Sequence, residues 1–199
     1  MLHEMHTIDA RRSVLVLVDY QTRLMPAIHD GARVLAEAVL LADVAHDLQL
    51  RVLGTEQNPA GLGPNDPEVA RRCDTMLAKM HFDACADGLE GAIGLRADGT
   101  RPDVVIAGCE AHVCLLQTTL GLLARGHRTW VVASACGSRR ASDHAAAMQR
   151  LQAAGATLVT TEMVLFEWLH GCEHPAFRTV LRRIKEHDRR QADAARSAA

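Results

Sequence analysis

The chain has 199 residues, of which 48% are hydrophobic and 23% charged, and its formal net charge at pH 7 is −2. This length fits one domain with a full hydrophobic core. The small net charge argues against a nucleic-acid-binding protein, and no apolar run is long enough to cross a bilayer. No apolar segment follows a basic start near residue 1, so we expect a cytoplasmic protein that is not bound to a membrane.

Apolar, β-branched runs alternate along the chain with stripes of helical period. The first run, SVLVLV at 13–18, is typical of a strand buried on both faces. Further strands are predicted near 51–55, 75–78, 104–107, 129–133 and 156–160. Helices are predicted at 32–50, 66–72, 84–93, from about 113, and at 141–154, 163–169 and 175–186. This alternation predicts an α/β fold, with parallel strands and helices on both faces.

The chain contains no internal repeat or low-complexity linker, which indicates a single unit. Residues 186–199 are polar and rich in alanine, and we expect them to form a frayed tail. The six cysteines show no CxxC motif and no regular spacing, so free thiols are predicted.

Polar side chains end or follow four of the predicted strands. Asp19 ends the first, Glu56 follows the second, Lys79 ends the third and Cys114 follows the fourth. In open parallel sheets, ligands bind beyond the carboxyl ends of the strands. The sequence therefore predicts a site in which a carboxylate, an ammonium group and a thiol meet.

Cys114 is a candidate nucleophile because it lies where a strand leads into a helix. Free N–H groups in the first helical turn favour a thiolate, and Lys79 would add to that effect. Asp19 would accept and return the proton, and N–H groups of the turn would stabilise a developing alkoxide. The alternatives are that Cys114 is a packing thiol and that Asp19 and Lys79 form an ion pair of little energetic value.

Several of these residues lie in segments that resemble a known family. Residues 18–21 (VDYQ), Lys79 with Phe82, and residues 108–114 (GCEAHVC) resemble the Asp, Lys and Cys motifs of the isochorismatase-like cysteine hydrolase superfamily. The likeness extends over residues 12–185, which we take as the hydrolase domain. Residues 55–64, 138–139 and 164–167 further resemble the isochorismatase-domain-containing subgroup.

The resemblance implies a three-layer α/β/α fold with a six-stranded parallel sheet of order 3-2-1-4-5-6, assembled as a homo-oligomer. It also implies a catalytic triad of Asp19, Lys79 and Cys114. A cis peptide bond is expected between Cys109 and Glu110. The oxyanion would then be held by the backbone N–H groups of Glu110 and Cys114.

Two departures from family patterns bear on the chemistry. Nicotinamidases of this superfamily hold a metal through an Asp-x-His pair and a further His just after the second strand, where this chain has Glu56, Gln57 and Asn58. True isochorismatases lack the nucleophilic cysteine, which is present here.

A second possible metal site lies near the end of the chain. Residues 170–174 (HGCEH) hold four candidate ligands, but no second cluster completes a zinc spacing, and we expect a structural or surface role there. We therefore expect no metal and no cofactor.

These observations together predict a cysteine hydrolase that cleaves a small amide, carbamate or ester through an acyl-enzyme on Cys114. Candidate walls of the substrate pocket are Tyr20, Gln21, Leu24, Gln57, Phe82 and His112. His112 could instead only fix the turn. Two alternatives stay open: an idle or weakly active member that serves as a binding module, and an acid-catalysed ether hydrolase that uses Asp19 without the thiol.

Overall fold

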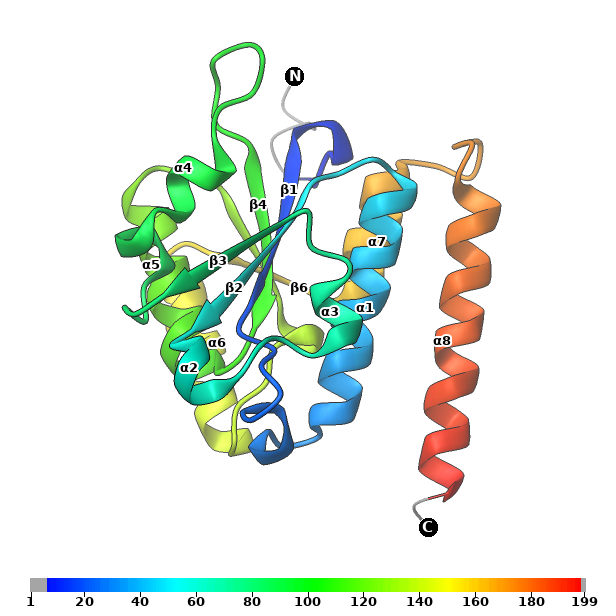
Figure 1. Ribbon diagram of the computed structural model, residues 1–199. Coiled ribbons are helices and arrows are strands. Elements are labelled where there is room, and N and C mark those ends of the chain that lie inside the picture. The colour runs from blue at the N-terminus through cyan, green and yellow to red at the C-terminus, as the bar shows by residue number, and fades with distance from the viewer. Residues whose placement is uncertain (1–6, 198–199) are drawn as a thin grey trace.

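The computed structural model describes residues 7–197, which form a six-stranded sheet with helices on both faces (Figure 1). The strands are β1 Ser13–Val18, β2 Val52–Gln57, β3 Thr75–Lys79, β4 Asp103–Gly108, β5 Thr129–Val132 and β6 Thr157–Val159. Every neighbouring pair is parallel and the order is β3-β2-β1-β4-β5-β6, which confirms the predicted topology.

Helices surround this sheet on both of its faces. They are α1 Gly31–Asp47, α2 Pro59–Leu62, α3 Pro67–Ala70, α4 Leu89–Ile93, α5 Leu116–Ala124, α6 Ala141–Ala153, α7 Thr161–Leu169 and α8 Phe177–Ser197. Helices α1 and α7 lie together on one side, and α4, α5 and α6 lie on the other (Figure 1). Helix α8 packs on α1, beyond the three layers.

The central strands β1 and β4 are apolar after their first residues, Ser13 and Asp103, because both sheet faces are covered. All of β4 and all of β1 after Ser13 are buried. The parallel register places Val18 beside both Thr55 and Gly108, and it pairs Gln57 with Lys79. The carboxyl ends of four strands are thereby aligned, which brings the residues that end or follow them to one edge of the sheet.

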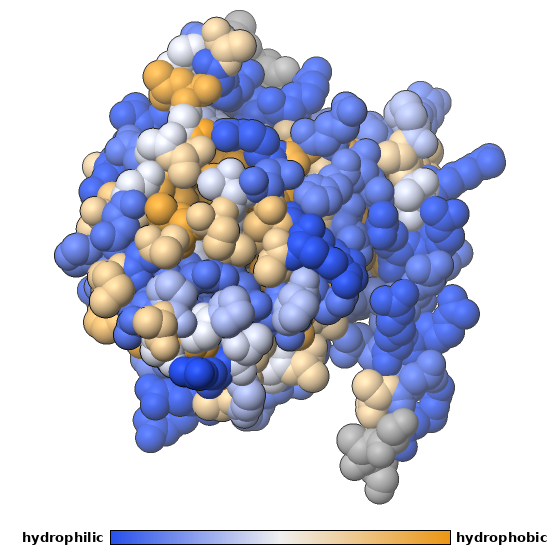
Figure 2. Space-filling model, in the orientation of Figure 1, coloured by the Kyte–Doolittle hydropathy of each residue, from blue (hydrophilic) through white to orange (hydrophobic). Residues whose placement is uncertain are grey.

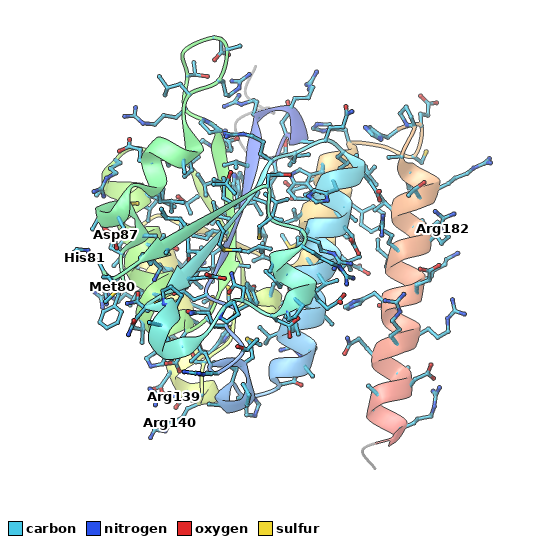
Figure 3. The ribbon with its side chains drawn as sticks, in the orientation of Figure 1. Met80, His81, Asp87, Arg139, Arg140 and Arg182 are labelled. Atoms are coloured by element: carbon cyan, nitrogen blue, oxygen red, sulfur yellow. The ribbon has the colours of Figure 1, made fainter. Side chains whose placement is uncertain are left out.

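Strand β3 is an edge strand, whose one neighbour is β2. The turn that follows it exposes Met80 and Phe82, at 66% and 49%. This turn is nevertheless ordered by Asp87, whose Oδ2 accepts the backbone N–H groups of Met80 and His81, each at 2.9 Å. Figure 3 shows Met80, His81 and Asp87 close together at this edge of the molecule.

The predicted frayed tail is helical as far as the structure describes it. Helix α8 continues to Ser197, and positions 198–199 lie outside the described residues. It buries Val180 and Ile184, while Arg183 pairs with Asp43 and Asp47 of α1. These contacts anchor the first half of the helix, from which the polar second half extends by backbone hydrogen bonding. Its visible surface is mostly hydrophilic (Figure 2), and Arg182 points away from the body (Figure 3).

Two further expectations can be compared with the structure. All six cysteines lie within residues 7–197 and are free. Across the same residues, no helix combines the length and the apolar character that a bilayer-spanning segment needs.

Gly108 ends β4 where its backbone approaches β1 closely. A Cβ atom at this position would lie 2.3 Å from the Val18 carbonyl oxygen and 2.5 Å from the Val18 Cβ. Relief would require β1 to move, and β1 carries Asp19 directly after Val18. The close packing of these two strand ends therefore depends on glycine at 108.

We expect Gly108→Ala to lower the free energy of unfolding by about 2 kcal/mol or more, because the added methyl group overpacks against backbone. Urea unfolding measures this change. Gly91→Ala in α4 is the matched control, because nothing lies within 4 Å of the Cβ it would add. Equal losses of stability in the two variants would contradict the close-approach argument.

Candidate active site

A buried ion pair joins the ends of β1 and β3. Lys79 Nζ lies 2.7 Å from Asp19 Oδ2, and neither side chain is exposed to solvent. Because β2 lies between β1 and β3, the Lys79 side chain reaches across the end of β2 to meet the carboxylate. The structure thus brings together the two charged residues that the sequence predicted at these strand ends.

Asp19 is held by a second strand as well. Its Oδ1 accepts a 2.6 Å hydrogen bond from Thr55 Oγ1, and its backbone N–H donates to the Thr55 carbonyl at 3.2 Å. Its φ of 55° lies in the left-handed region, which non-glycine residues seldom adopt. Sequence reasoning missed Thr55, although its place just before Glu56 at the end of β2 was a signal that could have found it.

Cys114 reaches the ion pair from the far side of β1. After β4 comes a cis peptide bond between Cys109 and Glu110, as the family resemblance implied. A π-helical turn, Ala111–Leu115, then precedes α5, so Cys114 lies in this turn and not in the first turn of the α-helix. Cys114 is 6% exposed, and its thiol interacts with both Asp19 and Lys79.

The surroundings of the thiol raise its pKa and so favour its protonated form, whereas the sequence predicted a stabilised thiolate. Burial raises the pKa of Cys114 to about 12, and the Asp19 carboxylate contributes in the same direction. Lys79 lowers this pKa, but its influence is the smaller one. Desolvation therefore outweighs the nearby cation.

The turn before Cys114 is braced by the loop after β5. Glu110 Oε1 accepts hydrogen bonds from Arg139 Nε at 2.9 Å and from the Arg139 backbone N–H at 3.2 Å. His112 Nδ1 lies 3.0 Å from Ser138 Oγ, so this histidine helps to fix the turn. Cys109 is fully buried, which raises its pKa well above the usual thiol range and indicates a packing role.

The predicted pocket walls divide into two groups. Tyr20 and Gln21, both predicted as pocket walls, are fully buried. The Tyr20 hydroxyl donates to the Ala135 carbonyl at 2.6 Å, because this ring fills the core beneath the strand ends. Leu24 is half-buried, whereas Phe82 is half exposed.

Gln57 is buried but faces the ion pair and the thiol. Its Oε1 accepts a 2.8 Å hydrogen bond from Lys79 Nζ and lies 4.0 Å from Cys114 Sγ. The Gln21 side chain fixes the Gln57 backbone. Gln21 Oε1 accepts the Gln57 N–H at 2.8 Å, and Gln21 Nε2 donates to the Gln57 carbonyl at 3.0 Å. The pair of glutamines therefore belongs to the support of the site.

Residues 7–197 contain no group of three or more His, Cys, Asp or Glu side chains arranged to hold a metal ion. Glu56 Oε1 accepts the Asn65 N–H at 2.8 Å and thus closes the loop after β2. In the 170–174 segment, His174 Nδ1 accepts the Ala176 N–H at 3.1 Å, and His170 lies 3.7 Å from Asp9. These side chains thus have structural contacts.

The pH dependence of Cys114 alkylation tests the coupling between Asp19 and the thiol. We expect Asp19→Asn to move the midpoint of the profile to lower pH by roughly one unit, because it removes a negative charge that raises the thiol pKa. Iodoacetamide labelling followed by peptide mass spectrometry measures the midpoint, which reports the pKa whatever the absolute rate.

The exposed Cys172 is the internal reference for these measurements, and its profile should not change. Breaking a buried ion pair on one side costs about 3–5 kcal/mol, so thermal melting must show that the variant is folded. An unmoved Cys114 midpoint in folded Asp19→Asn protein would mean that the carboxylate does not act on the sulfur.

Comparison with known proteins gives a consistent picture. A family model described as the isochorismatase domain matches residues 13–163. Isochorismatase domain-containing protein 2 of Homo sapiens is 36% identical over 177 residues, which cover 87% of this chain and 83% of the human protein.

Solved structures share the fold along most of the chain. A MAR1 ribonuclease from Caenorhabditis elegans superposes with a TM-score of 0.82 at 31% identity, covering 89% of this chain and 92% of that one. The YcaC gene product of Escherichia coli, described as an octameric hydrolase of unknown specificity, gives a TM-score of 0.80 at 21% identity and covers 98% of both chains.

Proposed function

The chain belongs to the isochorismatase-like hydrolase family, and from that premise we propose that it cleaves a small amide, carbamate or ester through an acyl-enzyme on Cys114. The observation that carries the proposal is the buried 2.7 Å contact between Lys79 and Asp19, with the Cys114 thiol against both. Three strand ends distant in sequence supply these groups. An acid, a cation and a thiol shielded from water suit nucleophilic acyl transfer.

The first half-reaction begins from the neutral thiol. Asp19 accepts the S–H proton as the sulfur attacks the carbonyl carbon, so that a C–S bond forms and the carbonyl oxygen becomes an alkoxide. The alkoxide collapses, the bond from carbon to the leaving nitrogen or oxygen breaks, and the leaving group takes the proton from Asp19. An acyl thioester remains on Cys114.

Water completes the cycle by the reverse proton path. Asp19 accepts a proton from a water molecule as the water oxygen attacks the thioester carbon. Collapse of the second alkoxide expels the sulfur, which recovers the proton from Asp19, and the acid product leaves. Because the thiol pKa is raised to about 12, a base beside the sulfur is needed at neutral pH.

The alkoxide would be stabilised by the N–H groups of Glu110 and Cys114 at the start of the helical turn. Neighbouring N–H groups are engaged: that of Ala111 donates to Gly137 at 2.6 Å, and that of Val113 donates to Glu110 at 3.0 Å. Arg139 holds the Glu110 side chain and so steadies the donor. Fixed donors of this kind favour the transition state without reorganisation.

The ether-hydrolase alternative has less support. It would use Asp19 as the acid but gives no role to the Cys114 thiol, which lies against Asp19 and Lys79. The binding-module alternative predicts the same geometry without turnover. Whether an acyl adduct forms on Cys114, and whether the substrate is hydrolysed, distinguishes the acyl-enzyme reaction, the ether hydrolase and the binding module.

We expect wild-type protein, incubated with a panel of small amides, carbamates and esters, to accumulate an acyl adduct on Cys114. Peptide mass spectrometry locates the adduct. Cys114→Ala and Asp19→Asn should each reduce hydrolysis by at least about 100-fold, because proton transfer by a positioned group contributes 10²–10⁴-fold. Cys172→Ala is the matched control and should leave the rate unchanged.

Other outcomes overturn the proposal in distinct ways. Full activity in Cys114→Ala with loss in Asp19→Asn would support the acid-catalysed reaction. No turnover and no adduct across the panel would support a binding module. An RNA oligonucleotide belongs in the panel because of the name of the Caenorhabditis elegans relative, and cleavage of RNA alone would contradict the carbonyl substrate class.

The chain is further proposed to form a homo-oligomer. Five large apolar side chains among the described residues are more than 40% exposed: Met80, Phe82, Leu95, Met163 and Phe166. Met80 and Phe82 share the turn after β3, and Met163 and Phe166 share α7, so two segments present apolar side chains that a second copy could cover. Light scattering after size exclusion should give a multiple of 21.6 kDa, and a mass of 21.6 kDa alone would contradict the proposal.

A further inference from the structure

The Gln57 carboxamide lies between the cation and the thiol of the site. Its oxygen accepts from Lys79 Nζ at 2.8 Å and lies 4.0 Å from Cys114 Sγ. Its nitrogen donates to the Met80 carbonyl at 2.9 Å. The residue is 8% exposed, and both of its backbone polar groups bond to the Gln21 side chain.

These contacts leave one orientation for the amide. A flipped carboxamide would turn its NH₂ group toward the Lys79 ammonium and its oxygen toward the Met80 carbonyl, so that donor faces donor and acceptor faces acceptor. The oxygen therefore points at Lys79 and Cys114. A neutral acceptor in this place can take the S–H hydrogen bond.

The same oxygen determines where the Lys79 protons go. An ammonium group has three donors. Around Lys79 Nζ stand Asp19 Oδ2 at 2.7 Å, Gln57 Oε1 at 2.8 Å and the His81 carbonyl at 3.4 Å. All three donors thus have oxygen acceptors, so the hydrogen bond by which Lys79 lowers the pKa of Cys114 has to compete with them.

We propose that Gln57 is a positioning residue that keeps Lys79 directed at Asp19 and holds the Cys114 thiol in its protonated form until substrate arrives. A hydrogen bond to the neutral form of a group disfavours ionisation, and an ammonium donor occupied elsewhere stabilises a thiolate less. The charged groups that face the sulfur are Asp19 at the end of β1 and Lys79 at the end of β3. A thiolate then forms only as Asp19 accepts its proton.

The consequence for turnover rests on the proposed hydrolase reaction, whereas the protonation of the thiol is measurable without any substrate. A resting thiol of this kind resists oxidation, which proceeds through the thiolate. The site would therefore keep its nucleophile intact between reaction cycles. The uncharged Gln57 side chain would thus control the protonation of the Cys114 thiol.

Two nearly isosteric variants should move the Cys114 alkylation profile in opposite directions. Gln57→Met removes the acceptor and releases a Lys79 donor toward the sulfur, so the midpoint should move to lower pH by about one unit. Gln57→Glu adds a negative charge beside the sulfur, and the midpoint should move to higher pH. At a fixed pH below the midpoint, one unit is a tenfold change in rate.

Gln117 provides the matched control. It is exposed on α5, three residues after Cys114, and Gln117→Met and Gln117→Glu should leave the profile in place. Cys172 labelling monitors the reagent, and thermal melting monitors folding. If Gln57→Met fails to fold, Gln57→Asn withdraws the amide oxygen from Lys79 with a smaller change and should move the midpoint to lower pH.

Shifts of both Gln57 variants in the same direction, or no shift relative to the Gln117 controls, would overturn the role of Gln57. Opposite shifts in a protein that hydrolyses none of the panel substrates would leave this role intact while refuting the hydrolase. The two proposals therefore fail by different measurements.

Discussion

The site depends on the ion pair that Lys79 and Asp19 form beneath the surface. Two charges removed from water incur a large desolvation penalty, which their attraction offsets only when geometry and further hydrogen bonds are favourable. Thr55, Gln57 and the His81 carbonyl supply those bonds. The pair therefore requires β1, β2 and β3 in register. The distance between the two charged groups is set by how these strands align.

A buried pair of this kind is weak evidence for stability, because apolar residues in its place often stabilise a fold as well or better. Its presence beside a thiol is better explained by reactivity. The carboxylate raises the thiol pKa and is also the group placed to take the thiol proton. In the proposed reaction, this one charge would suppress spontaneous ionisation of the thiol and support ionisation that is coupled to attack.

Much of this arrangement could be predicted from the sequence, because strand ends and apolar runs are local signals. Asp19, Lys79 and Cys114 follow directly from where strands stop, and the family resemblance supplied the strand order. The raised pKa of the Cys114 thiol was not predicted, since burial depends on how the whole chain packs around this residue.

Other features also depend on packing between distant segments. Tyr20 was predicted as a pocket wall, and the sequence did not reveal that its hydroxyl donates to the distant Ala135 carbonyl. The helical end of the chain follows from contacts with α1 that composition alone does not reveal. Local patterns therefore located the reactive groups better than their surroundings.

The position of β3 at the margin of the sheet determines which part of the site separates first when the protein begins to unfold. This strand is bonded on one side alone and carries the ammonium group, while the carboxylate and the thiol flank the sheet centre. Partial opening of a protein starts in its least supported elements. Gentle warming would then separate Lys79 from Asp19 before the core unfolds, and the ion pair would form again when β3 returns to the sheet.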